Sequence, residues 1–201
     1  MHGMRIAIVA MLVACVFAIP ARAQDFGAIG VARDTTGHVV KSKVYMSGGK
    51  VRADPEETGT ANEQAYVILD LVQRTATVVN VGQKTYTLQA PAQARQSLQF
   101  YASGASPCPP AGATCKDDGS ETLNGRSAEK WEISQSVQGQ TLLTRVWVDT
   151  KLHVWTKVEA MAGPTLVLSN ELQDIQEGPQ PASLFVIPAG FREVTVPRRI
   201  G

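Results

Sequence analysis

The sequence predicts one α+β domain, built mainly from antiparallel strands together with one amphipathic helix. Apolar and polar residues alternate with a period of two over most of residues 39–88 and again after residue 119. Glycine-containing turns separate these stretches, and only residues 91–102 show helical spacing. At 201 residues, 44% hydrophobic and 18% charged, the chain has the length and composition of one globular domain.

The first 23 residues have the features of a cleaved signal peptide. A short basic start, Met1–Arg5, precedes the almost wholly apolar run Ile6–Ile19. Ala21-Arg22-Ala23 then supplies the small residues that signal peptidase recognises. The apolar run is about 14 residues long, shorter than the roughly 20 residues of a spanning helix. We therefore expect residues 24–201 to form a single exported domain, periplasmic or secreted, with no transmembrane segment after cleavage.

A lipid-anchored form is the alternative to cleavage after Ala23. Leu12-Val13-Ala14-Cys15 resembles a bacterial lipobox, in which the cysteine would be lipidated. The residues after Cys15 stay apolar as far as Ile19, whereas a lipidated chain should turn polar at once. The sequence favours a signal peptide over lipid anchoring at Cys15.

The first strands are joined by a short hairpin turn. Residues 39–46 alternate in polarity, and Ser47-Gly48-Gly49-Lys50 follows, in which both glycines accept a positive φ. A two-residue turn here pairs residue 46 with residue 51, and places Tyr45 opposite Arg52. Strands are predicted next at 66–71, 75–81 and 84–88, with Tyr86 opposite Val79.

One helix of about three turns is expected over residues 91–102, starting at Pro91. Ala94, Leu98 and Tyr101 recur at helical spacing and form its apolar stripe. The stripe fits the core of the domain, and alternatively it fits contact with a ligand.

Two cysteines remain after signal cleavage, Cys108 and Cys115. They flank the turn-forming stretch 109–114, and an exported protein meets an oxidising environment. A structural disulfide is predicted, because six intervening residues do not fit the two-residue spacing of a redox motif.

The later strands, expected from Gly119 onward, carry two tryptophans. Even-numbered residues of 142–148 and 154–160 are apolar or Thr, and they share a face if a three-residue connection, 150–152, joins the strands. In that register Trp147 stands directly across from Trp155 among charged residues. Such a pair either shields a sheet surface or lines a site for a ligand or partner.

Motifs for catalysis, metals and nucleic acids are missing from the sequence. The net charge of +1 does not fit a nucleic-acid binder. After signal cleavage only His38 and His153 remain, too few for a histidine-based metal site. No nucleophile elbow or phosphate-binding glycine loop is present. We expect a protein that is not an enzyme and needs no metal or cofactor.

Several short motifs, in this order, resemble an uncharacterised family of exported bacterial domains, the DUF4412-type family. More distantly the chain resembles periplasmic lipoprotein carriers and their outer-membrane receptors of the LolA/LolB type. The resemblance covers about residues 26–193. The motifs are Gly49–Arg52, Tyr66–Asp70, Gln83–Tyr86, Asn124–Arg126, Val146–Asp149 and Leu184–Phe191.

The resemblance implies a curved open sheet, a half-barrel, with one or two helices covering its concave face. It implies an apolar hollow for an acyl chain, lipid or lipoprotein segment, with Leu98, Tyr101, Trp147 and Trp155 as ligand-binding candidates. Arg52 is the nearest match to the carriers' lid-holding arginine, although Ala53 replaces the proline that follows it in carriers. The alternative function is a protein-interaction or envelope-stress-sensing domain that uses an exposed aromatic face to bind an envelope protein.

Overall fold

The computed structural model describes residues 25–56, 64–94, 107–108, 112–137 and 139–195. The predicted signal peptide, the Cys15 alternative, Leu98 and Tyr101 lie outside these residues. Within them, no helix has the length and apolar character needed to cross a membrane.

The described residues form twelve strands, a short 3₁₀ helix and one helical turn at residues 91–94. The first six strands are β1 (Phe26–Asp34), β2 (Val39–Ser47), β3 (Lys50–Pro55), β4 (Ala65–Asp70), β5 (Thr75–Asn80) and β6 (Thr85–Leu88). The others are β7 (Ala113–Leu123), β8 (Arg126–Val137), β9 (Gln140–Asp149), β10 (Trp155–Ala162), β11 (Thr165–Glu177) and β12 (Arg192–Glu193). The 3₁₀ helix η2 (Ala182–Phe185) precedes β12.

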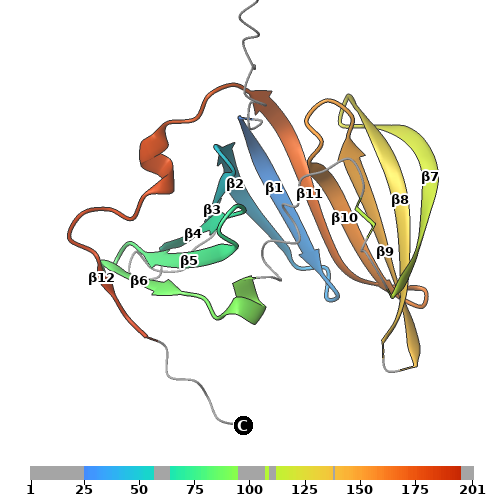
Figure 1. Cartoon of the computed structure of the whole chain (residues 1–201), viewed down its shortest axis with the longest axis horizontal. Coiled ribbons are helices and arrows are strands. Elements are labelled where there is room, and N and C mark those ends of the chain that lie inside the picture. Colours follow the sequence, from blue (N-terminus) through green and yellow to red (C-terminus); the bar gives the residue numbers. More distant parts are fainter. Residues whose placement is uncertain (1–24, 57–63, 95–106, 109–111, 138, 196–201) are drawn as a thin grey trace, which may run out of the picture.

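All twelve strands belong to one curved sheet, in the order β12-β6-β5-β4-β3-β2-β1-β11-β10-β9-β8-β7 (Figure 1). Strands β1–β6 form one meander and β7–β11 another. The two meanders meet where β1 pairs with β11, from Phe26↔Glu177 to Asp34↔Leu168. Neighbouring strands are antiparallel except β12, which runs parallel to β6. In the part of the chain that is described, β7 and β12 form the two edges, so the predicted open antiparallel sheet is confirmed.

The predicted hairpin register in the first meander is confirmed. Gly48 and Gly49 have φ of 58° and 75°, and residue 46 pairs with residue 51. Tyr45 therefore lies opposite Arg52, and two strands further along Tyr86 lies opposite Val79, both as predicted. Glycine suits these turn positions because L side chains disfavour a positive φ.

The pairing of neighbouring strands shows which side chains share each of the two faces of the sheet. The inner face of the first meander carries the main buried cluster, which includes Val44, Val51 and Leu69. Strand pairing continues this face across the second meander through Leu172, Val158, Val146 and Ile133. The outer face carries the alternate residues, among them Arg52, Tyr66 and Trp147. Period-two alternation thus placed apolar side chains on one continuous face.

The helix expected over residues 91–102 and the expected start of the later strands at Gly119 differ in part from the structure. A helix begins at Pro91 as expected, but only residues 91–94 of it are described, and the cover that a longer helix would give to the inner face stays a prediction. The later strands do not start at Gly119: β7 begins at Ala113. Gly119 instead lies in a bulge of β7 between Asp117 and Ser120, where its φ of 88° is acceptable.

The C-terminal segment crosses the outer face of the first meander. It leaves β11 at Gly178, whose amide donates to Asp25 O, and ends beside β6, where Val194 N donates to Tyr86 O. Phe185 of η2 is buried, and Phe191 packs against a small cluster that contains Tyr66 and Val79. This segment therefore covers apolar residues on a face that is otherwise polar.

An ion-pair network fixes one end of the second meander. Asp149, at the end of β9, is 1% exposed and accepts hydrogen bonds from Arg126 Nε at 2.5 Å and Nη2 at 3.3 Å. It also accepts from the amides of Lys151 at 2.9 Å and Leu152 at 2.6 Å. Arg126 reaches Glu177 at 2.9 Å. These bonds hold the β9–β10 connection in the shape that places Leu152 in the inner-face cluster.

Candidate functional site

The inner face is apolar across both meanders. Val44 and Val51 are fully buried in the first meander, as is Val146 in the second. Phe26 and Leu172 lie between them, on the two strands that join the meanders. Adjacent strands of a curved sheet direct these buried side chains toward one volume, and the apolar character of that volume makes this face the candidate site for an apolar ligand.

Residues before and after the undescribed stretch 95–106 both lie at this face. Ala94 is 2% exposed and belongs to the main inner-face cluster. Cys108 forms the predicted disulfide with Cys115, with 5.7 Å between the two Cα atoms. Cys115 pairs with Ile133 and packs against the inner-face cluster of the second meander. The disulfide therefore ties the chain before β7 to the inner face.

The two tryptophans do not face each other as predicted. Trp147 pairs with Lys157, and Trp155 pairs with Val148, because a bulge shifts the register between Trp155 and Lys157. The connection is also longer than three residues: β9 ends at Asp149 and β10 begins at Trp155. The predicted shared face of even-numbered residues is confirmed further along, where Val158 pairs with Val146.

The bulge places the two indoles on opposite faces. Trp155 packs against the Ile133, Val146 and Val148 cluster of the inner face. Trp147 is on the outer face and only 4% exposed. Lys157 Nζ lies 4.6 Å and Lys130 Nζ 5.6 Å from its ring centroid. Its indole N–H donates to Glu121. Trp147 is thus a covered side chain, and the expected exposed aromatic face is wrong at this position.

Arg52 holds a different part of the chain from the one suggested by the resemblance. Its Nε donates to Asp54 Oδ1 at 2.7 Å, and its Nη1 donates to the carbonyl of Leu184 in η2 at 3.2 Å. The guanidinium carbon lies 3.6 Å from the Tyr66 ring centroid. In the described residues, Arg52 thus fastens the C-terminal segment to the outer face. A role as latch for the 91–102 helix stays a prediction.

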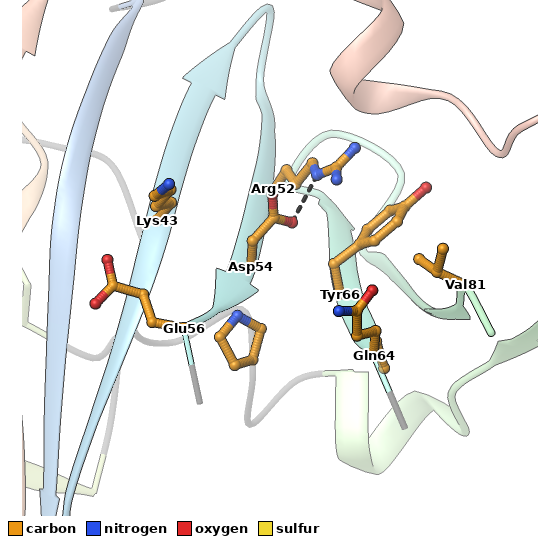
Figure 2. A pocket seen from close by; sticks show the side chains of 9 residues that line it. Lys43, Arg52, Asp54, Glu56, Gln64, Tyr66 and Val81 are labelled. Atoms are coloured by element: carbon orange, nitrogen blue, oxygen red, sulfur yellow. Dashed lines mark hydrogen bonds and ion pairs between the residues drawn. The ribbon is translucent and has the colours of Figure 1, made fainter. Parts of the chain in front are cut away.

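A polar pocket of about 490 Å³ opens beside Arg52 on the outer face (Figure 2). Figure 2 shows the Arg52–Asp54 pair between Lys43 and Glu56 on one side and Tyr66, Gln64 and Val81 on the other. Burial raises the pKa of the Tyr66 phenol, although the Arg52 charge acts in the opposite direction. The pocket is lined by Lys43, Arg52, Asp54, Pro55, Glu56, Gln64, Ala65, Tyr66 and Val81.

The residues with assigned positions contain no group of three His, Cys, Asp or Glu side chains that could hold a metal ion. Sequence reasoning found Arg52 but missed Lys43 and Glu56 as its pocket neighbours. The hairpin register could have found Lys43, because Tyr45 opposite Arg52 puts Lys43 opposite Asp54.

Comparison with known proteins gives similarity of fold. No protein-family model and no curated protein sequence matches the chain, so the DUF4412-type family stays a prediction. An uncharacterized conserved protein from Thermus thermophilus aligns with TM-score 0.57 and 10% identity, over 87% of this chain and 91% of that one. MucB aligns with TM-score 0.53 and 12% identity, over 84% of this chain and 58% of its own.

A LolA superfamily protein from Nitrosomonas europaea is more distant, with TM-score 0.41 and 9% identity over 82% of this chain and 90% of that one. The first two similarities show a shared fold. At 10% and 12% identity they do not show a shared function. The chain is similar in fold to MucB and to the Thermus protein: a curved, open, antiparallel sheet.

Proposed function

We propose that the chain is a non-enzymatic binding module of the cell envelope, whose inner face receives an acyl chain, a lipid or a lipidated protein segment. The observation that supports this most is the continuity of apolar side chains on the inner face. They run from Leu69 on β4 through Phe26 and Leu172 to Ile133 on β8.

Such a surface suits an acyl chain for a simple energetic reason. Burying each methylene group contributes roughly 0.8 kcal/mol, so a long chain gains affinity from shape and area alone. No catalytic group is needed for this task. The exported location on which the proposal depends rests on residues 1–23 of the sequence.

Titration of the purified protein with a fluorescent fatty acyl probe tests this function. We expect saturable binding that is weakened at least tenfold by Ile133→Gln, which puts an amide on the inner face. The matched control is Val72→Gln, because Val72 is 79% exposed in the β4–β5 turn. Thermal unfolding of each variant shows whether a loss of binding is a loss of folding.

Native mass spectrometry of protein purified from its own cell envelope supplies an independent measurement. A retained acyl ligand supports the proposal. No saturable binding by the purified protein, together with a native mass equal to the polypeptide alone, would contradict it.

A second candidate, a protein-interaction module, is favoured by the outer-face pocket. Among the described residues neither Lys43 nor Glu56 forms an ion pair, so the pocket offers one charge of each sign to a partner segment. A photo-crosslinking residue at Gln64, inside the pocket, should give one defined adduct in cells. The same residue at Val72, outside it, should not; equal labelling from both positions would reject this candidate.

A further inference from the structure

The inner face contains a buried hydrogen-bond donor with no acceptor. Trp131 lies on β8, opposite Val146 on β9 and Asp117 on β7. Its ring packs against the Ile133, Val146 and Val148 cluster, beside Cys115 of the disulfide. The indole Nε1 is inaccessible to solvent and has no hydrogen-bond partner in the described structure.

An indole N–H in this state is unusual and costs folding free energy. Buried tryptophans usually find an acceptor, and a buried donor without one loses its hydration with nothing in return. Trp147, on the neighbouring strand and the opposite face, illustrates the ordinary case by donating to Glu121. An unpaired donor within an apolar surface is therefore explained if the acceptor arrives with a ligand.

The charges around Trp131 restrict what that acceptor can be. By strand register, every Lys and Arg of β7 to β10 belongs to the outer face: these are Lys116, Arg126, Lys130, Arg145 and Lys157. Register places two ionisable side chains beside Trp131 on its own face: Asp117, directly across on β7, and Glu129, two residues earlier on β8. On the described inner face of β7 to β10 a carboxylate or phosphate would meet no cation and would be repelled by Asp117. A neutral carbonyl oxygen meets neither difficulty.

We infer that Trp131 positions the ligand by donating its indole N–H to the neutral carbonyl of an acyl ester or acyl amide, with the acyl chain along the apolar inner face. This inference rests on the proposed function and narrows its ligand from acyl chains in general to esterified or amidated ones. Free fatty acids are the weaker ligands, because the ionised carboxylate lacks a counter-charge on the described inner face of β7 to β10.

Three pyrene probes with the same chain length separate the parts of this inference: dodecylpyrene, pyrenedodecanoic acid and its methyl ester. For the unaltered protein we expect the ester to bind about fivefold to tenfold more tightly than the hydrocarbon, since one hydrogen bond is added. The acid should bind more weakly than the ester. Trp131→Phe, which removes the N–H and keeps an aromatic ring, should abolish the advantage of the ester and leave hydrocarbon binding unchanged.

Trp155→Phe is the matched control, because Trp155 packs against the same cluster and the ester advantage should survive its substitution. The inference is overturned if Trp131→Phe leaves the ester advantage intact or weakens all three probes equally, and the proposed function then stands. If no probe saturates the unaltered protein, the proposed function itself fails.

An indole NMR spectrum keeps the test informative if Trp131→Phe does not fold. The chain has three tryptophans, so three indole N–H signals are expected, and Trp147→Phe and Trp155→Phe assign them by elimination. The Trp131 signal should move downfield on adding the ester and stay in place on adding dodecylpyrene. An equal response to both probes would contradict a hydrogen bond to the carbonyl.

Discussion

Replacing Asp149 by Asn should destabilise the domain through one buried carboxylate. The carboxylate is 1% exposed and receives two bonds from Arg126 and two from backbone amides. The Asn oxygen can keep the amide bonds of Lys151 and Leu152, but its NH₂ group then faces the guanidinium, donor against donor. The charge-assisted interaction with Arg126 is therefore lost, which is worth about 1.5–3 kcal/mol.

The expected loss of unfolding free energy is about 2–3 kcal/mol. It stays below the roughly 3–5 kcal/mol seen when a buried charge loses its only partner, because Arg126 keeps Glu177 at 2.9 Å. For a domain of this size it corresponds to a fall in Tm of roughly 5–10 °C. Urea unfolding followed by tryptophan fluorescence measures it. Glu177→Gln, which removes a more exposed partner of the same arginine, should cost clearly less than Asp149→Asn.

The pH dependence gives the same prediction a second check. Burial acts to raise the pKa of Asp149, but the bonds from Arg126, Leu152 and Lys151 outweigh it, and the pKa lies below its ordinary value. The stabilisation is thus complete above about pH 4, where an unfolded Asp is ionised, and disappears as the pH falls through the folded pKa. The difference between the unaltered protein and Asp149→Asn should shrink in acid. A loss below about 1 kcal/mol at pH 7, or an equal loss at pH 3 and pH 7, would refute the reasoning.

Three further predictions concern other contacts. Replacing both cysteines of the disulfide by serine should lower the unfolding free energy by about 2 kcal/mol, measured by thermal unfolding, and reduction of the unaltered protein should do the same. Arg52→Ala should raise amide hydrogen exchange around Leu184 about tenfold, because the segment loses its side-chain anchor; unchanged exchange there would reject that role. Trp147→Phe should cost about 1 kcal/mol in urea unfolding, because Glu121 loses a donor; a variant as stable as the parent would contradict this.

The parts of the fold that depend on local signals could be predicted from the sequence. Two adjacent glycines fixed the hairpin at 48–49, so the pairing of Tyr45 with Arg52 followed by counting. The disulfide followed from the number and spacing of the cysteines. In both cases the determining residues are close together in the chain.

The misplaced tryptophans show where local counting fails. The β9–β10 connection takes its shape from Asp149, whose carboxylate binds amides within the loop and Arg126 on another strand. The bulge that follows in β10, between Trp155 and Lys157, has no turn motif in the sequence, and it places Trp155 on the inner face.

The candidate sites depend on contacts between residues that are far apart in the sequence, and such contacts could not be predicted from it. Arg52 was selected from the sequence, but its acceptor at Leu184 lies 132 positions away. Trp131 escaped notice because its significance is an unfilled hydrogen bond, which only the arrangement of its neighbours reveals.

The pairing of β1 with β11 has a consequence for how the chain acquires its structure. Each meander contains only connections between consecutive strands, so each can form from residues that are close in sequence. The pairing of β1 with β11 instead joins Phe26 to Glu177, near the other end of the domain. Closing so long a loop is entropically costly, and folds dominated by such distant pairings assemble slowly. The joining of the two half-sheets should therefore be the late, rate-limiting event, and until then the apolar residues of both halves remain accessible to chaperones.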